Sequence, residues 1–216
     1  MGIPVLILGG TGTGKTTSLR NFEENEITVY NVASKPLPFK KKFPKTYQAP
    51  NYAKITKSMA KNGSKTYIID DSQYLLAFEL FDKVNVLGYE KFTQLAVNFK
   101  QLITFVSNEL PSDAIVYFLH HTETNEYGMT KAKTIGKMLD EKITVEGLFT
   151  IVLQTKIEKG QYFFVTQNTG MSTCKSPMEM FELEIDNDLK FVDERIREYY
   201  ELGGKKDEST KQLGQR

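Results

Sequence analysis

The sequence predicts an α/β fold: a mostly parallel sheet with helices on both faces and an antiparallel β-hairpin near the C-terminal end. Short apolar runs alternate with helix-like stretches, a glycine-rich loop follows the first run, and a turn between two apolar stretches marks a hairpin. The 216 residues, 40% of them hydrophobic, suit one domain with a substantial core. We expect that domain to cover residues 1–202 and a polar, flexible tail to cover 203–216.

The apolar runs have the length and composition of buried strands. They cover residues 4–8, 27–32, 65–71 and 114–119. Apolar residues at helical spacing predict helices over residues 52–61, 75–84, 90–109 and 188–202. Residues 148–156 and 161–166 are the predicted hairpin strands. Residues 124–134 are polar and predict a mobile loop, which either contacts DNA or is a solvated connection.

The glycine-rich loop after the first apolar run matches the P-loop pattern, and a helix is expected to follow it. The loop reads Gly9-Gly10-Thr11-Gly12-Thr13-Gly14-Lys15-Thr16. Its glycines allow backbone N–H groups to approach a triphosphate, and the helix N-terminus favours that anion. Lys15 is expected to reach the β- and γ-phosphates, and the Thr16 hydroxyl to bind Mg²⁺. The sequence therefore predicts ATP and Mg²⁺ as cofactors. The expected nucleotide-binding residues are Gly10, Thr11, Gly12, Thr13, Gly14, Lys15, Thr16 and Thr17.

Two acids end the predicted strand 65–71, which is a Walker B candidate. Asp70 is the first acid after the apolar run, so we expect it to join Thr16 at the Mg²⁺ ion and to act in catalysis with Lys15. Asp71 has two interpretations of equal weight. It orients or deprotonates the attacking water, or else Asp71 or Ser72 caps the next helix.

Both histidines of the chain follow the predicted strand 114–119. In parallel sheets ligands bind at the carboxyl ends of the strands, so a polar group there can sense the γ-phosphate. We expect His120 to contact the nucleotide and His121 to take part in catalysis, with at least one of them in the sensing role. The alternative is that both are structural.

The segment 34–48 carries lysines, interleaved aromatic residues and prolines but no acid. It is either a solvated, proline-stiffened loop or a surface for a nucleic-acid backbone and its bases. In the second case Lys40, Lys41, Lys42 and Phe43 are the expected contacts. Because the formal net charge is only +1, a nucleic-acid site has to be a local patch.

Composition excludes several classes. Cys174 is the sole cysteine, which excludes an internal disulfide, and with two histidines it makes a structural zinc site a poor expectation. No apolar stretch is long enough to span a membrane, and the chain starts at once with a core strand. We therefore expect a cytoplasmic protein that makes no membrane contact.

The order of these parts resembles the small phage-encoded ATPases with a RecA-like core, some of which are classed as single-strand annealing or recombination proteins. The resemblance rests on the loop 9–16, Ile68-Ile69-Asp70-Asp71, the segment 31–39, the run 118–123, and the regions 136–137 and 162–164. It implies ATP-dependent binding or remodelling of single-stranded DNA by a homo-oligomer.

Two departures from that pattern bear on turnover. RecA-like proteins usually have a water-positioning glutamate after the second strand, whereas residues 31–35 contain no acid, so hydrolysis is slow or depends on Asp71. RecA-like sites also take a cation from the neighbouring subunit. The chain has only four arginines, which makes Lys156 and Lys159 of the hairpin the candidates for this trans-acting finger, or else ordinary exposed lysines.

Three other functions compete. The missing glutamate favours a binding module that holds ATP as a clamp with little turnover. A nucleotide or small-molecule kinase is disfavoured because no arginine lies between residues 21 and 194 to build a lid. A GTPase is weaker still, since no Asp-x-x-Gly follows the strand 65–71 and the segment 155–158 lacks the guanine-reading aspartate.

Overall fold

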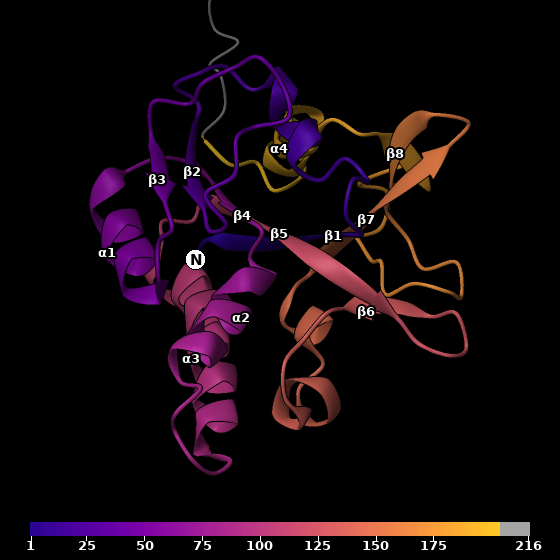
Figure 1. Cartoon of the computed structure of the whole chain (residues 1–216). Coiled ribbons are helices and arrows are strands. Elements are labelled where there is room, and N and C mark those ends of the chain that lie inside the picture. Colours follow the sequence, from indigo (N-terminus) through magenta and orange to yellow (C-terminus); the bar gives the residue numbers. More distant parts are fainter. Residues whose placement is uncertain (204–216) are drawn as a thin grey trace, which may run out of the picture.

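The computed structural model describes residues 1–203 and shows an α/β fold built on a mostly parallel sheet (Figure 1). The strand order is β3-β2-β4-β5-β1-β7-β8-β9, with β6 paired to β5. Strands β1 to β5 and β7 pair in parallel, whereas β8, β9 and β6 join as antiparallel strands. The strands are β1 (Ile3–Gly9), β2 (Ile27–Asn31), β3 (Thr46–Gln48), β4 (Thr66–Asp70), β5 (Ile115–Thr124), β6 (Thr130–Ala132), β7 (Ile151–Glu158), β8 (Gln161–Val165) and β9 (Glu184–Asp186).

Helices cover both faces of this sheet, so the predicted architecture and hairpin are confirmed. One face packs against α1, α2 and α3, and the other against η1 and α4. The helices are α1 (Tyr52–Asn62), α2 (Gln73–Asp82), α3 (Glu90–Glu109) and α4 (Leu189–Tyr199), with short turns η1 (Thr16–Asn21), η2 (Met138–Lys142) and η3 (Val145–Leu148). The predicted tail falls almost wholly outside the described residues.

Strand alternation explains the two cores. Successive strand residues point to opposite faces, so Leu6 and Leu8 of β1 pack under α3, whereas Val5 and Ile7 pack under η1 and α4. Burial of both faces explains why these strands are continuous apolar runs in the sequence. The sheet is therefore a rigid support that fixes whatever follows the carboxyl end of each strand.

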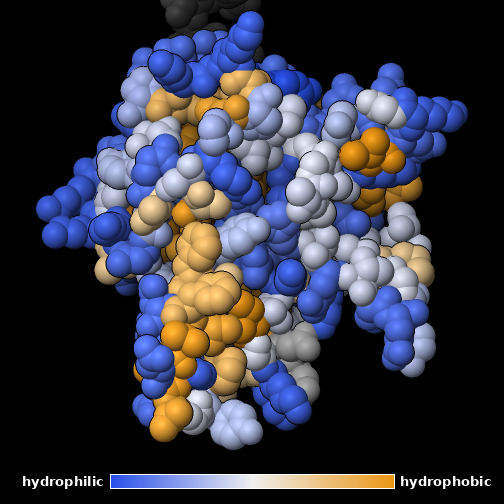
Figure 2. Space-filling view, viewed as in Figure 1, coloured by the Kyte–Doolittle hydropathy of each residue, from blue (hydrophilic) through white to orange (hydrophobic). Residues whose placement is uncertain are grey.

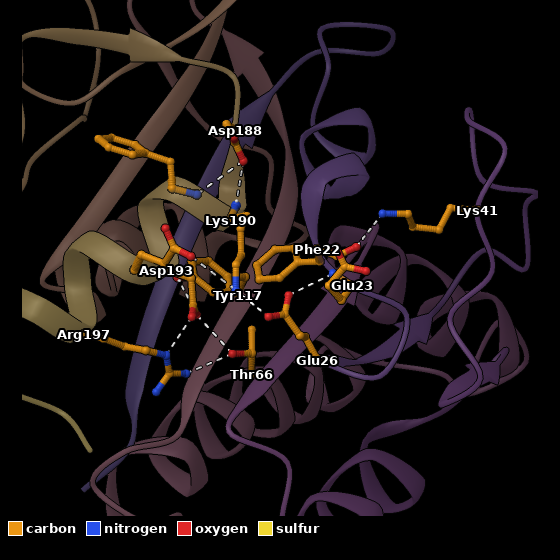
Figure 3. A network of polar contacts seen from close by, with 12 residues as sticks. Phe22, Glu23, Glu26, Lys41, Thr66, Tyr117, Asp188, Lys190, Asp193 and Arg197 are labelled. Atoms are coloured by element: carbon orange, nitrogen blue, oxygen red, sulfur yellow. Dashed lines mark hydrogen bonds and ion pairs between the residues drawn. The ribbon is translucent and has the colours of Figure 1, made fainter. Parts of the chain in front are cut away.

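Helix α4 is bound to the sheet by a buried polar network (Figure 3). Both the Thr66 and Tyr117 hydroxyls donate to Oδ1 of Asp193 at 3.1 Å. Arg197 Nε donates to Oδ2 of the same carboxylate at 2.7 Å. At the start of the helix, Asp188 accepts hydrogen bonds from the backbone of Lys190 and Phe191, a side-chain N-cap. Residues 187 and 188 are thereby fixed beside the glycine-rich loop.

Four local details differ from the expectations. The strand predicted over 114–119 continues to Thr124, because its outer end pairs with β6. The loop expected over 124–134 is therefore largely a hairpin, which turns at Gly128 with a φ of 79°. The expected helix after the loop 9–16 is the six-residue 3-10 turn η1, which ends where Phe22 becomes extended. The segment 34–48 contains the unpredicted edge strand β3.

Candidate functional site

Loops from three strands meet at the carboxyl edge of the sheet. In the parallel register of β1 and β5, Gly9 lies opposite His121. Strand β4 pairs with the other side of β5, which brings Asp70 and Asp71 to the same edge. The glycine-rich loop and the ends of β4 and β5, three segments that are far apart in the sequence, are thus gathered at one edge of the sheet.

Lys15 lies folded onto its own loop. Its Nζ donates to the carbonyl oxygens of Gly9 and Gly10, both at 2.8 Å, and the residue is buried. Burial lowers the pKa of Lys15 to about 8, although the carboxylates of Asp71 and Asp70 act in the opposite direction. The ammonium is therefore poorly solvated, and its two partners are neutral carbonyls that an anion can replace.

The loop is packed closely against β7 and β8. A Cβ on Gly9 would lie 2.0 Å from the Thr155 hydroxyl oxygen, and one on Gly14 would lie 2.9 Å from the Tyr162 ring. Gly14 also has a φ of 97°, which only glycine adopts easily. The Thr155 hydroxyl donates to Leu8 O and to Thr13 Oγ1, and Thr13 donates to Gly10 O at 2.9 Å. These contacts fix the loop's shape.

Thr16 and Asp70 contact each other directly. The Thr16 hydroxyl donates to Oδ1 of Asp70 at 2.9 Å. Burial, reinforced by the neighbouring Asp71, raises the pKa of Asp70 to about 6. A cation bound here would stabilise the ionised carboxylate that the buried environment otherwise disfavours.

The donor chemistry fits Mg²⁺ held jointly with a ligand. Within residues 1–203, no cluster of three or more His, Cys, Asp or Glu side chains could hold a metal alone. Mg²⁺ typically binds through one or two carboxylates, keeps several waters and completes its shell with phosphate oxygens. One hydroxyl and one carboxylate, from Thr16 and Asp70, match that requirement.

Asp71 holds an unusual backbone position and is heavily paired. It has a φ of 60°, a left-handed conformation that Asp tolerates better than most residues. Its carboxylate forms an ion pair with Lys35 and accepts from His121 Nε2 at 3.1 Å. Burial would raise the pKa of Asp71, but the His121 hydrogen bond and the Lys35 pair outweigh it and hold the pKa at about 2.

Helix capping does not explain either candidate residue. Ser72 stands at the start of α2 but makes no side-chain capping bond. Its hydroxyl instead lies 2.9 Å from His120 Nδ1 and 3.2 Å from the Leu119 carbonyl oxygen. The Asp71 side chain is likewise directed to Lys35 and His121.

The two histidines point to different environments. His120 is fully buried on the α3 side, and its Nε2 must donate to Lys133 O, 2.9 Å away, because a carbonyl only accepts. Burial lowers its pKa to about 4, so it is neutral at pH 7. His121 instead joins Asp71 and packs edge-on against Tyr74. The structure thus brings His121, and not the side chain of His120, to the predicted catalytic group.

Lys35 and Asn187 are site residues that the sequence interpretation missed. Lys35 follows β2, where an acid was sought, and its ammonium lies over the Tyr74 ring at 5.6 Å as well as against Asp71. Asn187 precedes α4 beside Gly14, and Arg20 donates to its backbone oxygen. Among the described residues, the buried Nδ2 of Asn187 has no hydrogen-bond partner. The position of Lys35 in the segment that follows β2 was a usable signal, but nothing local marked Asn187.

The remaining expected contacts are dispersed. Phe43 is 4% exposed and packs on Phe39, so its ring is closed to base stacking in this structure. Lys41 donates to the backbone oxygen of Phe22 (Figure 3) and to that of Arg20, whereas Lys40 and Lys42 are exposed. In the hairpin, Lys156 pairs with Glu158 and Glu184.

Other expected residues lie around the loop. Lys159 is exposed at the hairpin turn, Thr11 and Gly12 face open space, and Thr17 accepts from Arg20 through its backbone. No helix within the described residues could cross a membrane. No model of a known protein family matches the chain, and a search of curated proteins finds no match either.

Proposed function

We propose that the chain is a P-loop NTPase with a RecA-like core that binds and hydrolyses Mg·ATP. We further propose that it acts on single-stranded DNA in the cytoplasm, in phage-type recombination or replication. The observation that carries the nucleotide site is the 2.9 Å contact between Thr16 and Asp70 beside Lys15. It puts a hydroxyl, a carboxylate and an ammonium at the carboxyl edge of the sheet, which is the chemistry that Mg²⁺ and a triphosphate require.

In this proposal the residues of the loop exchange partners when ATP binds. Lys15 leaves the carbonyl oxygens of Gly9 and Gly10 for the β- and γ-phosphate oxygens, which are stronger acceptors. Thr16 and Asp70 hold the metal, and the unpartnered amide of Asn187 offers a further donor beside the loop. When bound, Mg²⁺ neutralises charge that develops on the phosphates.

Asp71 and His121 are suited to orienting a water molecule. A carboxylate with a pKa of about 2 is a weak base, so abstraction of a proton by Asp71 is disfavoured. Orientation needs only an acceptor held in place, and Lys35 and His121 hold this one. The low basicity supports slow turnover and keeps the alternative of an ATP clamp as the second candidate.

The rate of ATP hydrolysis, measured with and without single-stranded DNA, distinguishes the ATPase from the ATP clamp. Lys15→Ala serves as the variant that is expected to be inactive. DNA-stimulated phosphate release that vanishes in the variant supports the proposed ATPase. Tight Mg·ATP binding without turnover in either condition supports the clamp. Phosphate transfer to an added nucleoside monophosphate would instead identify a kinase and overturn both.

Association into a homo-oligomer is supported by exposed apolar side chains. They gather where α2 ends and α3 begins, the orange region low in Figure 2. Leu87 is 92% exposed and Tyr89 88%, and Phe81 and Val84 lie nearby in the sequence. Contiguous apolar surface of this kind commonly marks a protein interface. Sedimentation of wild type and Leu87→Glu tests this, and a monomeric wild type with and without Mg·ATP would contradict it.

A further inference from the structure

A basic groove runs along the free edge of the sheet, between β3 and α1. It has a volume of about 780 Å³ and is lined by Lys45, Lys54, Lys57 and Lys61 together with Tyr30 and Tyr47. Strand β3 pairs only with β2, so its other edge is open within the described chain. No acidic side chain lines the groove. It is separate from the loop 9–16 and from the lysines at 40–42.

The lysines of this groove are arranged as one stripe. Positions 54, 57 and 61 have the spacing of a single helix face, opposite the buried Ile55 and Met59 of α1. From Lys54 to Lys61 the helix rises about 10 Å. Figure 2 shows hydrophilic side chains projecting over α1, at the left. Lys45, directly before β3, also lines the groove.

The charges of these four lysines are not neutralised by neighbouring side chains of the described chain, in contrast to the charge of Lys35. Within residues 1–203, none of the four forms an ion pair or a side-chain hydrogen bond. By contrast, Lys35 is paired with Asp71 and Lys41 is bound to backbone carbonyls. Four unneutralised ammonium groups along one groove attract a polyanion whose charges are repeated along its length.

An aromatic platform stands in the same groove. Tyr47 is 43% exposed and stacks on buried Tyr30 at 5.4 Å, and Tyr30 in turn stacks on Tyr67 at 6.4 Å. The three rings sit on the neighbouring strands β3, β2 and β4, so the outermost ring is held rigidly. A fixed aromatic face beside a basic stripe provides base stacking and phosphate contacts together, as single-stranded nucleic acid requires.

We infer that the β3–α1 groove binds single-stranded nucleic acid, with its backbone along the lysine stripe and a base on Tyr47. The inference rests on the proposed function, since it assigns the surface that contacts the proposed DNA partner.

The groove also adjoins the candidate site. The Ala49 backbone N–H, just after β3, donates to the Asn31 carbonyl oxygen, and the Asn31 side chain forms hydrogen bonds with the backbone N–H and C=O of Lys35. Occupation of the groove is therefore expected to raise turnover.

Fluorescence anisotropy with labelled oligothymidylate tests this, with the variant Lys54→Gln/Lys57→Gln/Lys61→Gln. Its matched control is Lys91→Gln/Lys100→Gln/Lys142→Gln, which removes the same charge elsewhere. Log affinity falls with log salt, and the loss of three phosphate contacts makes this slope shallower by about 2. We expect this change in the groove variant and not in its control. Tyr47→Ala lowers affinity about tenfold without changing that slope, whereas the control Tyr199→Ala, at an exposed tyrosine of α4, changes neither. Thermal unfolding and Mg·ATP binding stay near wild type in all of them.

Each other outcome is decisive. An unchanged salt slope in the groove variant would overturn the inference and show that these lysines only protect an edge strand from pairing. Equal competition by inorganic polyphosphate, with no effect of Tyr47→Ala, would also overturn it in favour of a general polyanion site. Oligouridylate in place of oligothymidylate distinguishes RNA from DNA. If wild type binds Mg·ATP but no oligonucleotide, the proposed DNA partner and the groove inference are both wrong, and the proposed nucleotide site stands. If it binds DNA through the groove but does not bind Mg·ATP, the groove inference stands and the proposed nucleotide site is wrong.

Discussion

The Thr16 hydroxyl donates to Asp70 Oδ1 at 2.9 Å, although 54 residues separate the two in the chain. Strand β5 lies between β1 and β4, so the carboxylate of one strand reaches the loop of another across the end of a third. The contact depends on a carboxylate whose ionised form is disfavoured by burial. A bound cation would reverse that preference, which makes the pair a sensitive probe of the site.

Asp70→Asn is expected to stabilise the metal-free protein at neutral pH. The folded-state pKa of about 6 lies above the ordinary 3.8, so the folded state binds more protons between these values. Wild type therefore loses stability as pH rises through this window, by about 3 kcal/mol in all, and the variant, which keeps an acceptor for Thr16, does not. Urea unfolding of both proteins from pH 4 to 8 measures the difference. Two parallel stability curves would contradict the raised pKa.

His120→Gln is expected to reveal the opposite pH dependence. The folded-state pKa of about 4 lies below the ordinary 6.5, so the unfolded state binds more protons between them. The stabilisation from neutral His120 is complete above pH 6.5 and is lost as pH falls towards 4, by about 1.4 kcal/mol per pH unit. Because Asp70 acts in the opposite direction, wild type shows little net slope between pH 4 and 6 from these two groups. NMR titration of His120 gives a direct check, and an ordinary pKa would refute this.

Removal of the charge on Asp71 is expected to slow turnover without weakening nucleotide binding. Asp71→Asn keeps a residue that tolerates the φ of 60° but loses the ion pair with Lys35. Asp71→Ala also loses the ion pair and adds backbone strain of about 1 kcal/mol or more. Comparison of the two variants therefore separates the effect of the lost charge from the effect of backbone strain. Single-turnover rates and ATP dissociation constants for both variants decide this. Equal weakening of binding and rate by Asp71→Asn would assign the carboxylate to binding instead.

Substitution by alanine is expected to be far more damaging at Gly9 than at the adjacent Gly10. A Cβ on Gly9 would lie 2.0 Å from Thr155 Oγ1 and 2.6 Å from Thr13 Oγ1, whereas one on Gly10 meets nothing nearer than 3.6 Å. Gly9→Ala therefore disrupts the loop and lowers Mg·ATP affinity, and Gly10→Ala serves as the matched control. Calorimetric titration of each variant measures the effect. If the two substitutions behaved alike, the close packing of the loop against β7 would be wrong.

The sequence predicted those features that depend on local pattern. Buried parallel strands appear as apolar runs, so the sheet and the place of Asp70 and Asp71 could be predicted from the residues alone. The outer end of β5 could not, because Thr122 to Thr124 are extended through pairing with residues 130–132. The same limit applies to Phe43, whose burial depends on packing against Phe39 within the segment 34–48.

Pairings between distant residues account for what was missed in the candidate site. Lys35 was grouped with the other lysines of its segment, since only the fold brings it to Asp71. Asn187 approaches Gly14 because α4 is bound to the sheet through Asp193, a contact without a sequence signal. The histidine pair was expected at the strand end, but strand alternation sends His120 to the α3 side.

Calorimetric titration of ATP into the full chain, with and without Mg²⁺, tests the nucleotide site most directly, using wild type, Lys15→Ala and the surface control Lys100→Ala. The account predicts Mg²⁺-dependent binding by wild type and the control, and its loss in Lys15→Ala while the variant stays folded by circular dichroism. Binding that is equal in all three proteins, or absent from wild type, would contradict it.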